Sequence, residues 1–158
     1  MSFLADDRMN PPFSITSRLA IEHRSALEEL LFFNAGQDLV RHRIEATIER
    51  YGMPELYEKE GALRVRLRGT AEPQVLFAVA AQPQPRPVGM ALFVRESEER
   101  FVIVHIGVAP DFAAEGPYAD AHLFFHLLQA IRSAARRTRG VRFVDLFYGE
   151  GRTRHIRV

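Results

Sequence analysis

The sequence contains no cysteine, and this absence excludes disulfides, thiolate nucleophiles and zinc–thiolate sites. It also has no apolar run that approaches the roughly 20 residues needed to span a membrane. The first residues, MSFLADDRMNPPF, lack the basic start and the long apolar segment of a signal peptide. We therefore expect a soluble cytoplasmic protein without a membrane partner.

Lysine is nearly absent as well, since 20 of the 21 basic residues are arginine and only Lys59 is lysine. The formal net charge is +1, which gives no electrostatic argument for a nucleic-acid partner. The 158 residues, 47% of them hydrophobic, fit one domain with its own core. We expect a flexible arm over residues 1–12 and a single domain over residues 13–158.

Hydrophobic periodicity along the chain predicts both helices and strands. Residues 22–36 and 38–51 have apolar side chains at helical spacing, and Asp38 is a good N-cap for the second helix. Alternating or continuous apolar runs predict strands at residues 13–21, 62–69, 74–81, 88–96 and 100–110. The last three strands read as an antiparallel meander.

The clearest helix follows this meander. Leu123, Leu127 and Ile131 lie on one apolar face, Asp120 can cap the start, and Gly140 can end the segment. Residues 141–149 then predict a strand, and residues 152–158 a short final one.

The stretch VGMALFVRESEERFVIVHIGVAPDF, residues 88–112, resembles the hairpin and central strand of the GNAT superfamily of N-acetyltransferases. Its ending has the Val-x-Pro-x-aromatic pattern of that family, with Val108, Pro110 and Phe112. The resemblance is strongest over residues 88–148, and the two earlier helices extend it to residue 13. It implies a twisted, mostly antiparallel central sheet with two N-terminal helices and one long helix after the central strand, an α+β fold.

The resemblance also implies a function, an acyl-CoA-dependent transfer of an acetyl group to a small-molecule or peptide amine. In that family, acetyl-CoA pairs with the backbone of the central strand, and the next loop and helix N-terminus hold its pyrophosphate. The corresponding cofactor contacts here are Ile106, Gly107, Val108, Gly116, Tyr118 and Ala119. Relatives use a Glu or His on this strand as a base and a tyrosine as an acid, so His105 and Tyr148 are the candidate catalytic residues.

Three residues of the loop depart from the family signature and leave a second hypothesis open. Ala113 replaces an expected Arg or Gln, Glu115 brings negative charge, and Pro117 has no N–H to donate. Only ten residues follow Tyr148, whereas relatives continue with another helix and two strands. The alternative is a non-catalytic GNAT-like module that binds a ligand or forms a homodimer.

Each candidate residue also has a structural explanation. His105 can be a histidine with a structural hydrogen bond, and Tyr148 an amphipathic residue at a sheet edge. His122 and His126 have the i, i+4 spacing of zinc ligands but lack a third ligand in the sequence, so we predict no metal site. An exposed edge at Phe125 favours a dimer contact.

Overall fold

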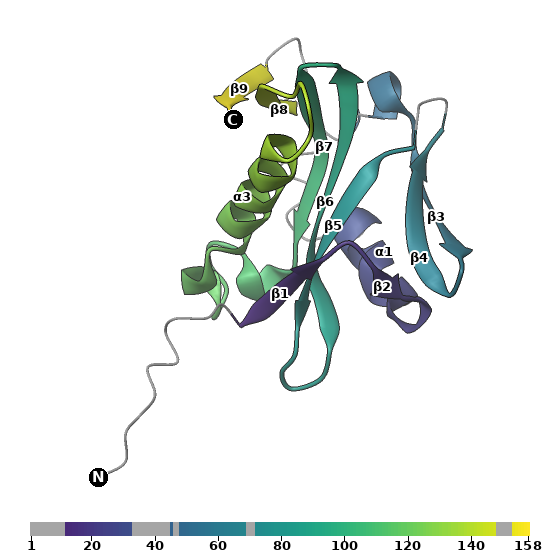
Figure 1. Ribbon diagram of the computed structural model, residues 1–158. Coiled ribbons are helices and arrows are strands. Elements are labelled where there is room, and N and C mark those ends of the chain that lie inside the picture. The colour runs from purple at the N-terminus through teal and green to yellow at the C-terminus, as the bar shows by residue number, and fades with distance from the viewer. Residues whose placement is uncertain (1–11, 33–44, 46–47, 69–71, 148–152) are drawn as a thin grey trace.

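In the computed structural model, residues 12–32, 45, 48–68, 72–147 and 153–158 are described, and a six-stranded twisted sheet runs through them (Figure 1). In spatial order its strands are β1 (Phe13–Thr16), β5 (Gln74–Ala80), β6 (Arg86–Ser97), β7 (Arg100–Val108), β8 (Phe143–Phe147) and β9 (Thr153–Arg157). Neighbouring strands are antiparallel except β7 and β8, which are parallel. The predicted α+β class with a mixed, mostly antiparallel sheet is confirmed.

A second, three-stranded sheet has the order β2 (Leu19–Ala20), β4 (Ala62–Leu67), β3 (Pro54–Lys59). In β4 the side chains of Leu63, Val65 and Leu67 are buried, as the alternating pattern predicted. The strand β3 was not predicted, because its sequence PELYEK has no apolar alternation. It pairs with β4 on one side only, and proline is tolerated on such an edge strand.

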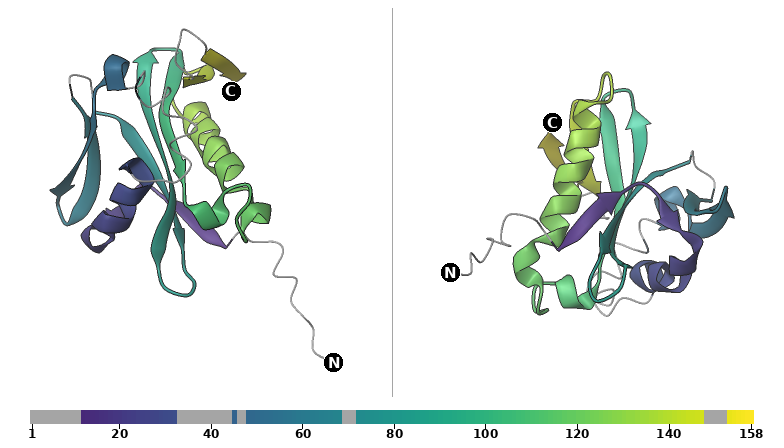
Figure 2. Two further views of the ribbon diagram at one scale, coloured as in Figure 1. Left: turned by 180° about the vertical axis from the view of Figure 1, so that it is seen from behind. Right: turned by 60° about the horizontal axis from the view of Figure 1, so that its bottom comes forward.

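Two α-helices cover opposite faces of the large sheet: α1 (Arg24–Phe32), preceded by the 3-10 turn η1 (Ile21–His23), and α3 (Leu123–Arg136) (Figure 2). A Cβ added to Gly89 of β6 would lie 3.0 Å from a methyl of Leu123, so Gly89 faces α3. A Cβ added to Gly107 of β7 would lie 2.8 Å from the carbonyl oxygen of Leu30, so Gly107 faces α1. Both glycines let a helix approach the sheet closely.

The hydrophobic core extends over both faces of the sheet, and part of it lies between α3 and the sheet. Phe93 of β6 and Phe101 of β7 are almost completely buried, with ring centroids 5.2 Å apart. Leu127 and Ile131 of α3 are fully buried as well. The apolar face predicted for this helix therefore forms the core, and burial of such side chains contributes about 2 kcal/mol each.

The structure differs from the elements predicted from the sequence in three details. The first predicted strand is divided, since β1 belongs to the large sheet and β2 to the small one. Asp120 was the wrong cap, because the 3-10 turn η4 (Ala119–Ala121) contains it and His122, with φ 51°, precedes α3. The predicted helix at residues 38–51 lies mostly outside the described residues, although residues 48–51 are helical.

No helix in the described part of the chain is long and apolar enough to cross a membrane.

Candidate functional site

The strand β7 contains a bulge at Val104. The pairs Phe93–Ile103 and Leu92–His105 are consecutive in the β6–β7 ladder, so Val104 has no partner on β6. On the other side of β7, the parallel ladder with β8 ends at Ile103. The two irregularities are adjacent, so from Val104 onward β7 pairs only with β6 among the described strands.

The hydrogen-bond pattern decides which peptide groups face the unpaired side. Ala109 donates its N–H to the carbonyl of Val88 at 2.7 Å, which marks that pair as hydrogen-bonded. Hydrogen-bonded and non-hydrogen-bonded pairs alternate along an antiparallel ladder, and the register continues without a shift to Ile106. The peptide groups of Gly107 therefore face β6, whereas those of Ile106 and Val108 point away from it. No described strand pairs with Ile106 on that side.

The loop between β7 and α3 satisfies most of its own N–H groups. Gly116 donates to the carbonyl of Ala113 at 2.8 Å, Tyr118 to Asp111 at 2.8 Å, and Ala119 to Gly116 at 3.2 Å. These are the three loop residues predicted to hold a pyrophosphate. In this conformation their N–H groups form turns of the loop, which include the 3-10 turn η3 (Pro110–Phe112).

Gly116 has a packing role in this loop. A Cβ at this position would lie 2.4 Å from the carbonyl oxygen of Asp111, which is backbone and has little freedom to move. Two aromatic side chains of the loop also pack together: the rings of Phe112 and Tyr118 stack with their centroids 5.0 Å apart. The side chain of Arg86 reaches Asp111 at 2.5 Å, so this cation beside the loop already has an acidic partner.

The start of α3 provides the free donors at this end of the sheet. The first hydrogen bond of the helix runs from the N–H of His126 to the carbonyl of His122 at 3.0 Å. The N–H groups of Leu123, Phe124 and Phe125 precede it and have no partner inside the helix. They lie at the positive end of the helix dipole.

His105 lies just beyond the bulge and, by strand alternation, on the face of the sheet covered by α1. Its Nε2 atom is buried and accepts no hydrogen bond from the described residues. Burial lowers the pKa of His105, and hydrogen bonding to the Leu30 backbone opposes that shift. The imidazole is therefore neutral near pH 7, and its Nε2 makes no hydrogen bond with the described residues.

Two other predictions concern Tyr148 and metal binding. Tyr148 lies outside the described residues. His122 and His126 lie at the start of α3, and no group of three His, Cys, Asp or Glu in the described chain is arranged to hold a metal ion.

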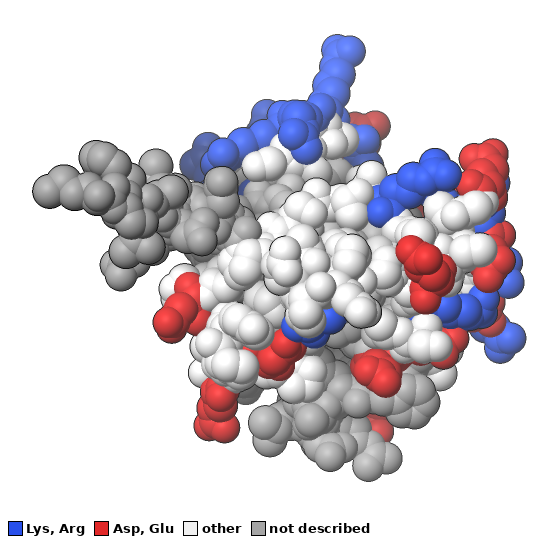
Figure 3. Space-filling model, turned by 90° about the horizontal axis from the view of Figure 1, so that it is seen from below, with Lys and Arg blue, Asp and Glu red and all other residues white. Residues whose placement is uncertain are grey.

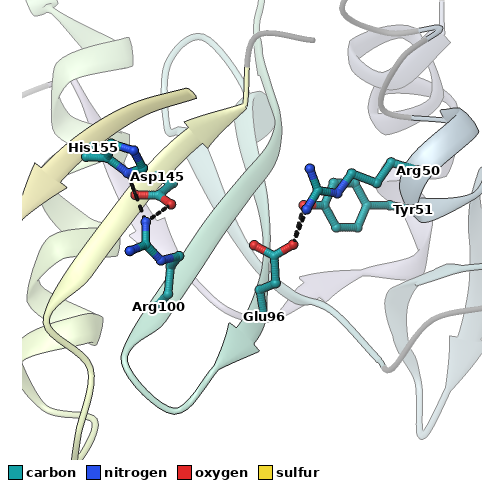
Figure 4. Close-up of polar contacts among 6 residues, drawn as sticks. All are labelled: Arg50, Tyr51, Glu96, Arg100, Asp145 and His155. Atoms are coloured by element: carbon teal, nitrogen blue, oxygen red, sulfur yellow. Dashed lines mark hydrogen bonds and ion pairs between the residues drawn. The ribbon is translucent and has the colours of Figure 1, made fainter. Parts of the chain in front are cut away.

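The structure also brings together three residues that sequence reasoning did not select: Arg100, Asp145 and His155 (Figure 4). Asp145 of β8 is 2% exposed and is the one buried charged residue among those described. It forms an ion pair with Arg100 of β7, and its Oδ1 lies 2.6 Å from Nδ1 of His155 on β9. Nδ1 of His155 also lies 2.9 Å from Nη1 of Arg100, so the three side chains contact one another.

A second polar cluster lies on the same face of the sheet and contains Arg50, Tyr51 and Glu96 (Figure 4). Arg50 forms an ion pair with Glu96 at 2.5 Å, and the phenol of Tyr51 hydrogen-bonds to the same carboxylate at 3.4 Å. Burial, together with the negative charge of Glu96, raises the pKa of Tyr51 to about 12. Strand alternation places Glu96, Arg100 and Asp145 on the face opposite α3, near the closed end of the β7–β8 ladder.

One signal in the sequence could have identified Asp145. It is the single charged residue in the apolar stretch FVDLF, and a carboxylate inside a strand flanked by apolar residues needs a partner. Its partners, Arg100 and His155, become predictable only once β7, β8 and β9 are known to be neighbours.

The surface at the start of α3 is largely uncharged, with acidic side chains along its margin (Figure 3). It includes Tyr118, Phe124 and Phe125, which are 48%, 47% and 55% exposed. Phe125 was predicted to be exposed here.

Comparison of the chain with family models, with curated proteins and with solved structures found no match.

Proposed function

We propose that this protein is an acyl-CoA-dependent N-acyltransferase of the GNAT type. The observation that supports the proposal best is Ile106 of β7, whose peptide groups point away from β6 to a side where no described strand pairs with it. An extended ligand with amide groups can add to such an edge as an extra strand. The pantetheine arm of acetyl-CoA has this chemistry.

The remainder of the cofactor would lie toward the start of α3. With Gly116, Tyr118 and Ala119 engaged inside their loop, the donors available for a pyrophosphate are the N–H groups of Leu123, Phe124 and Phe125. Glu115 is exposed in the same loop and weakens this site by repulsion. We therefore expect weak binding in which the arm contributes more than the phosphates.

When bound, acetyl-CoA supplies an activated thioester, and the protein has to orient an amine and accept its proton. His105 is the proposed base, because its imidazole is neutral and its Nε2 is free. Tyr148 is the proposed acid. The amine would be carried by a small molecule or a peptide.

The engaged loop favours a second candidate function, a non-catalytic GNAT-like module. Turns formed by Gly116, Tyr118 and Ala119 have to break before their N–H groups can bind a phosphate. Such a module would bind a ligand at the β7 edge without transferring a group, or would form a homodimer through the exposed ring of Phe125.

A thermal-shift titration separates the candidates. Acetyl-CoA, S-acetylpantetheine and 3′,5′-ADP are added separately, and saturation at about 100 times Kd should stabilise the protein by about 2.7 kcal/mol. We expect shifts with acetyl-CoA and acetylpantetheine and a smaller one with the nucleotide. Release of free CoA in the presence of an amine panel indicates the enzyme, whereas binding without release indicates the module. No shift with millimolar acetyl-CoA would exclude the cofactor.

A further inference from the structure

Charge is divided unevenly along the chain. Residues 132–158 contain eight basic and two acidic residues, a formal charge of +6. Residues 1–131 contain 13 basic and 18 acidic residues, a formal charge of −5. The net charge of +1 is the sum of two opposed regions, so composition alone hides a strongly basic segment.

In the described part of this segment, the end of α3 and the start of β8 lie beside β9 (Figure 1). Nη2 of Arg132 on α3 donates to the carbonyl of Arg157 on β9 at 3.2 Å. The carbonyl of Arg142 accepts the N–H of Val158 at 3.0 Å. We call this surface the arginine edge; its described members are Arg132, Arg136, Arg137, Arg139, Arg142 and Arg157.

The guanidinium groups of the arginine edge are poorly neutralised. Arg142 lies 3.9 Å from Glu99, and both side chains are more than half exposed. No ion pair with a described residue involves Arg136, Arg137 or Arg139, all of which are exposed. Asp145, the acidic residue nearest in the chain, is buried and engaged by Arg100 and His155.

Arginines elsewhere in the described chain are mostly paired. Arg66 and Arg68 both contact Glu55, at 2.9 Å and 2.6 Å, and Arg24 lies 3.2 Å from Glu28. The negative end of the α3 dipole explains why Arg136 and Arg137 are favourable at the end of this helix. It does not explain Arg142 and Arg157, which lie on other elements.

The arginine edge also contains a hollow. Its lining consists of Val141, Arg142, Phe143, Arg157 and Val158. Apolar side chains together with two cations fit an anionic chain that alternates phosphates with rings. A run of Asp or Glu residues offers charges without the rings.

We propose that the arginine edge binds the sugar–phosphate backbone of a single-stranded nucleic acid. Guanidinium groups pair with phosphate oxygens, and the hollow admits the edge of a base or sugar. Such contacts are independent of sequence and sensitive to salt, because each neutralised phosphate releases counterions. The acidic remainder of the molecule repels the same ligand, which orients the strand along this edge.

Fluorescence anisotropy with a labelled RNA of about 16 nucleotides tests the proposal. At about 50 mM salt we expect a Kd in the micromolar range, weakening at least tenfold by about 200 mM. The triple substitution Arg136→Gln, Arg137→Gln, Arg139→Gln changes exposed side chains and should weaken binding at least tenfold. The control Arg24→Gln, Arg66→Gln, Arg68→Gln removes the same charge elsewhere and should have less than a threefold effect, with circular dichroism confirming that both variants fold.

Three results would overturn the proposal. They are no binding at low salt, equal weakening by the two triple variants, and competition by polyglutamate as effective as that by unlabelled RNA. The last result would assign the arginine edge to an acidic protein instead.

Discussion

Ile103 of β7 and Leu146 of β8 form the last pair of the parallel ladder, and the bulge at Val104 follows immediately. A bulge bends its strand and increases the local twist, and β7 continues past it to Val108, beyond its last described pair with β8. Among the described strands, the stretch of β7 after the bulge therefore pairs only with β6. The proposed function depends on this edge, because an edge that has no permanent partner can bind an extended ligand.

Gly107→Ala should destabilise the protein by about 1–3 kcal/mol, measured by urea denaturation. The added Cβ would lie 2.8 Å from the carbonyl oxygen of Leu30, and the backbone of α1 has to move. Gly89→Ala is the matched control, because its nearest neighbours are the flexible ends of Leu123 and Leu127. An equal loss in both variants would contradict the close approach of α1 to β7.

Asp145→Asn should lower the free energy of unfolding by about 2–3 kcal/mol. This loss is smaller than that expected for a fully buried ion pair, because Arg100 and His155 reach solvent. The substitution leaves Arg100 without its carboxylate. Glu55→Gln, which removes the partner of two exposed arginines, should change stability much less. Urea midpoints that fall by the same amount in both variants would show that Asp145 has no special structural role.

His105 should make stability depend on pH. Its pKa in the folded protein lies below the ordinary value of 6.5, so the unfolded chain binds the proton first as the pH falls. The free energy of unfolding should therefore decrease below about pH 6.5, by at most about 1.4 kcal/mol per pH unit, and level off below the folded pKa. His105→Gln should remove this contribution, whereas His122→Gln, the loss of an exposed histidine, should retain it. A wild-type profile that matches that of His105→Gln would contradict the burial of this imidazole.

Tyr51 should ionise late. Its pKa of about 12 predicts that Tyr51 is still unionised near pH 11 in an absorbance titration, and that Tyr51→Phe reduces the late step, whereas Tyr57, whose pKa is also raised, remains in the variant. The raised pKa is a stabilising contribution that is complete below pH 10 and is lost as the pH rises through about 12. A titration in which Tyr51→Phe loses an early-ionising group would show that its phenol is exposed.

Local patterns predicted the elements better than the contacts between them. Alternation located β4 and the meander of β5, β6 and β7, and helical spacing located α3. The strand β3 was missed because its pairing with β4, rather than its composition, makes it a strand. The site shows the same limit, since the turns that engage Gly116 and the partners of Asp145 depend on tertiary contacts that no local pattern encodes.

Amide hydrogen exchange at Ile106 tests the central claim most directly. In the free protein, the Ile106 amide should exchange faster than that of Gly107, because it points away from β6 and none of the described strands pairs with it on that side. Saturating acetyl-CoA should slow exchange at Ile106 and leave Gly107 unchanged. Equal protection of both amides in the free protein would contradict the open edge, and an Ile106 rate unaffected by bound acetyl-CoA would contradict its use as the binding site.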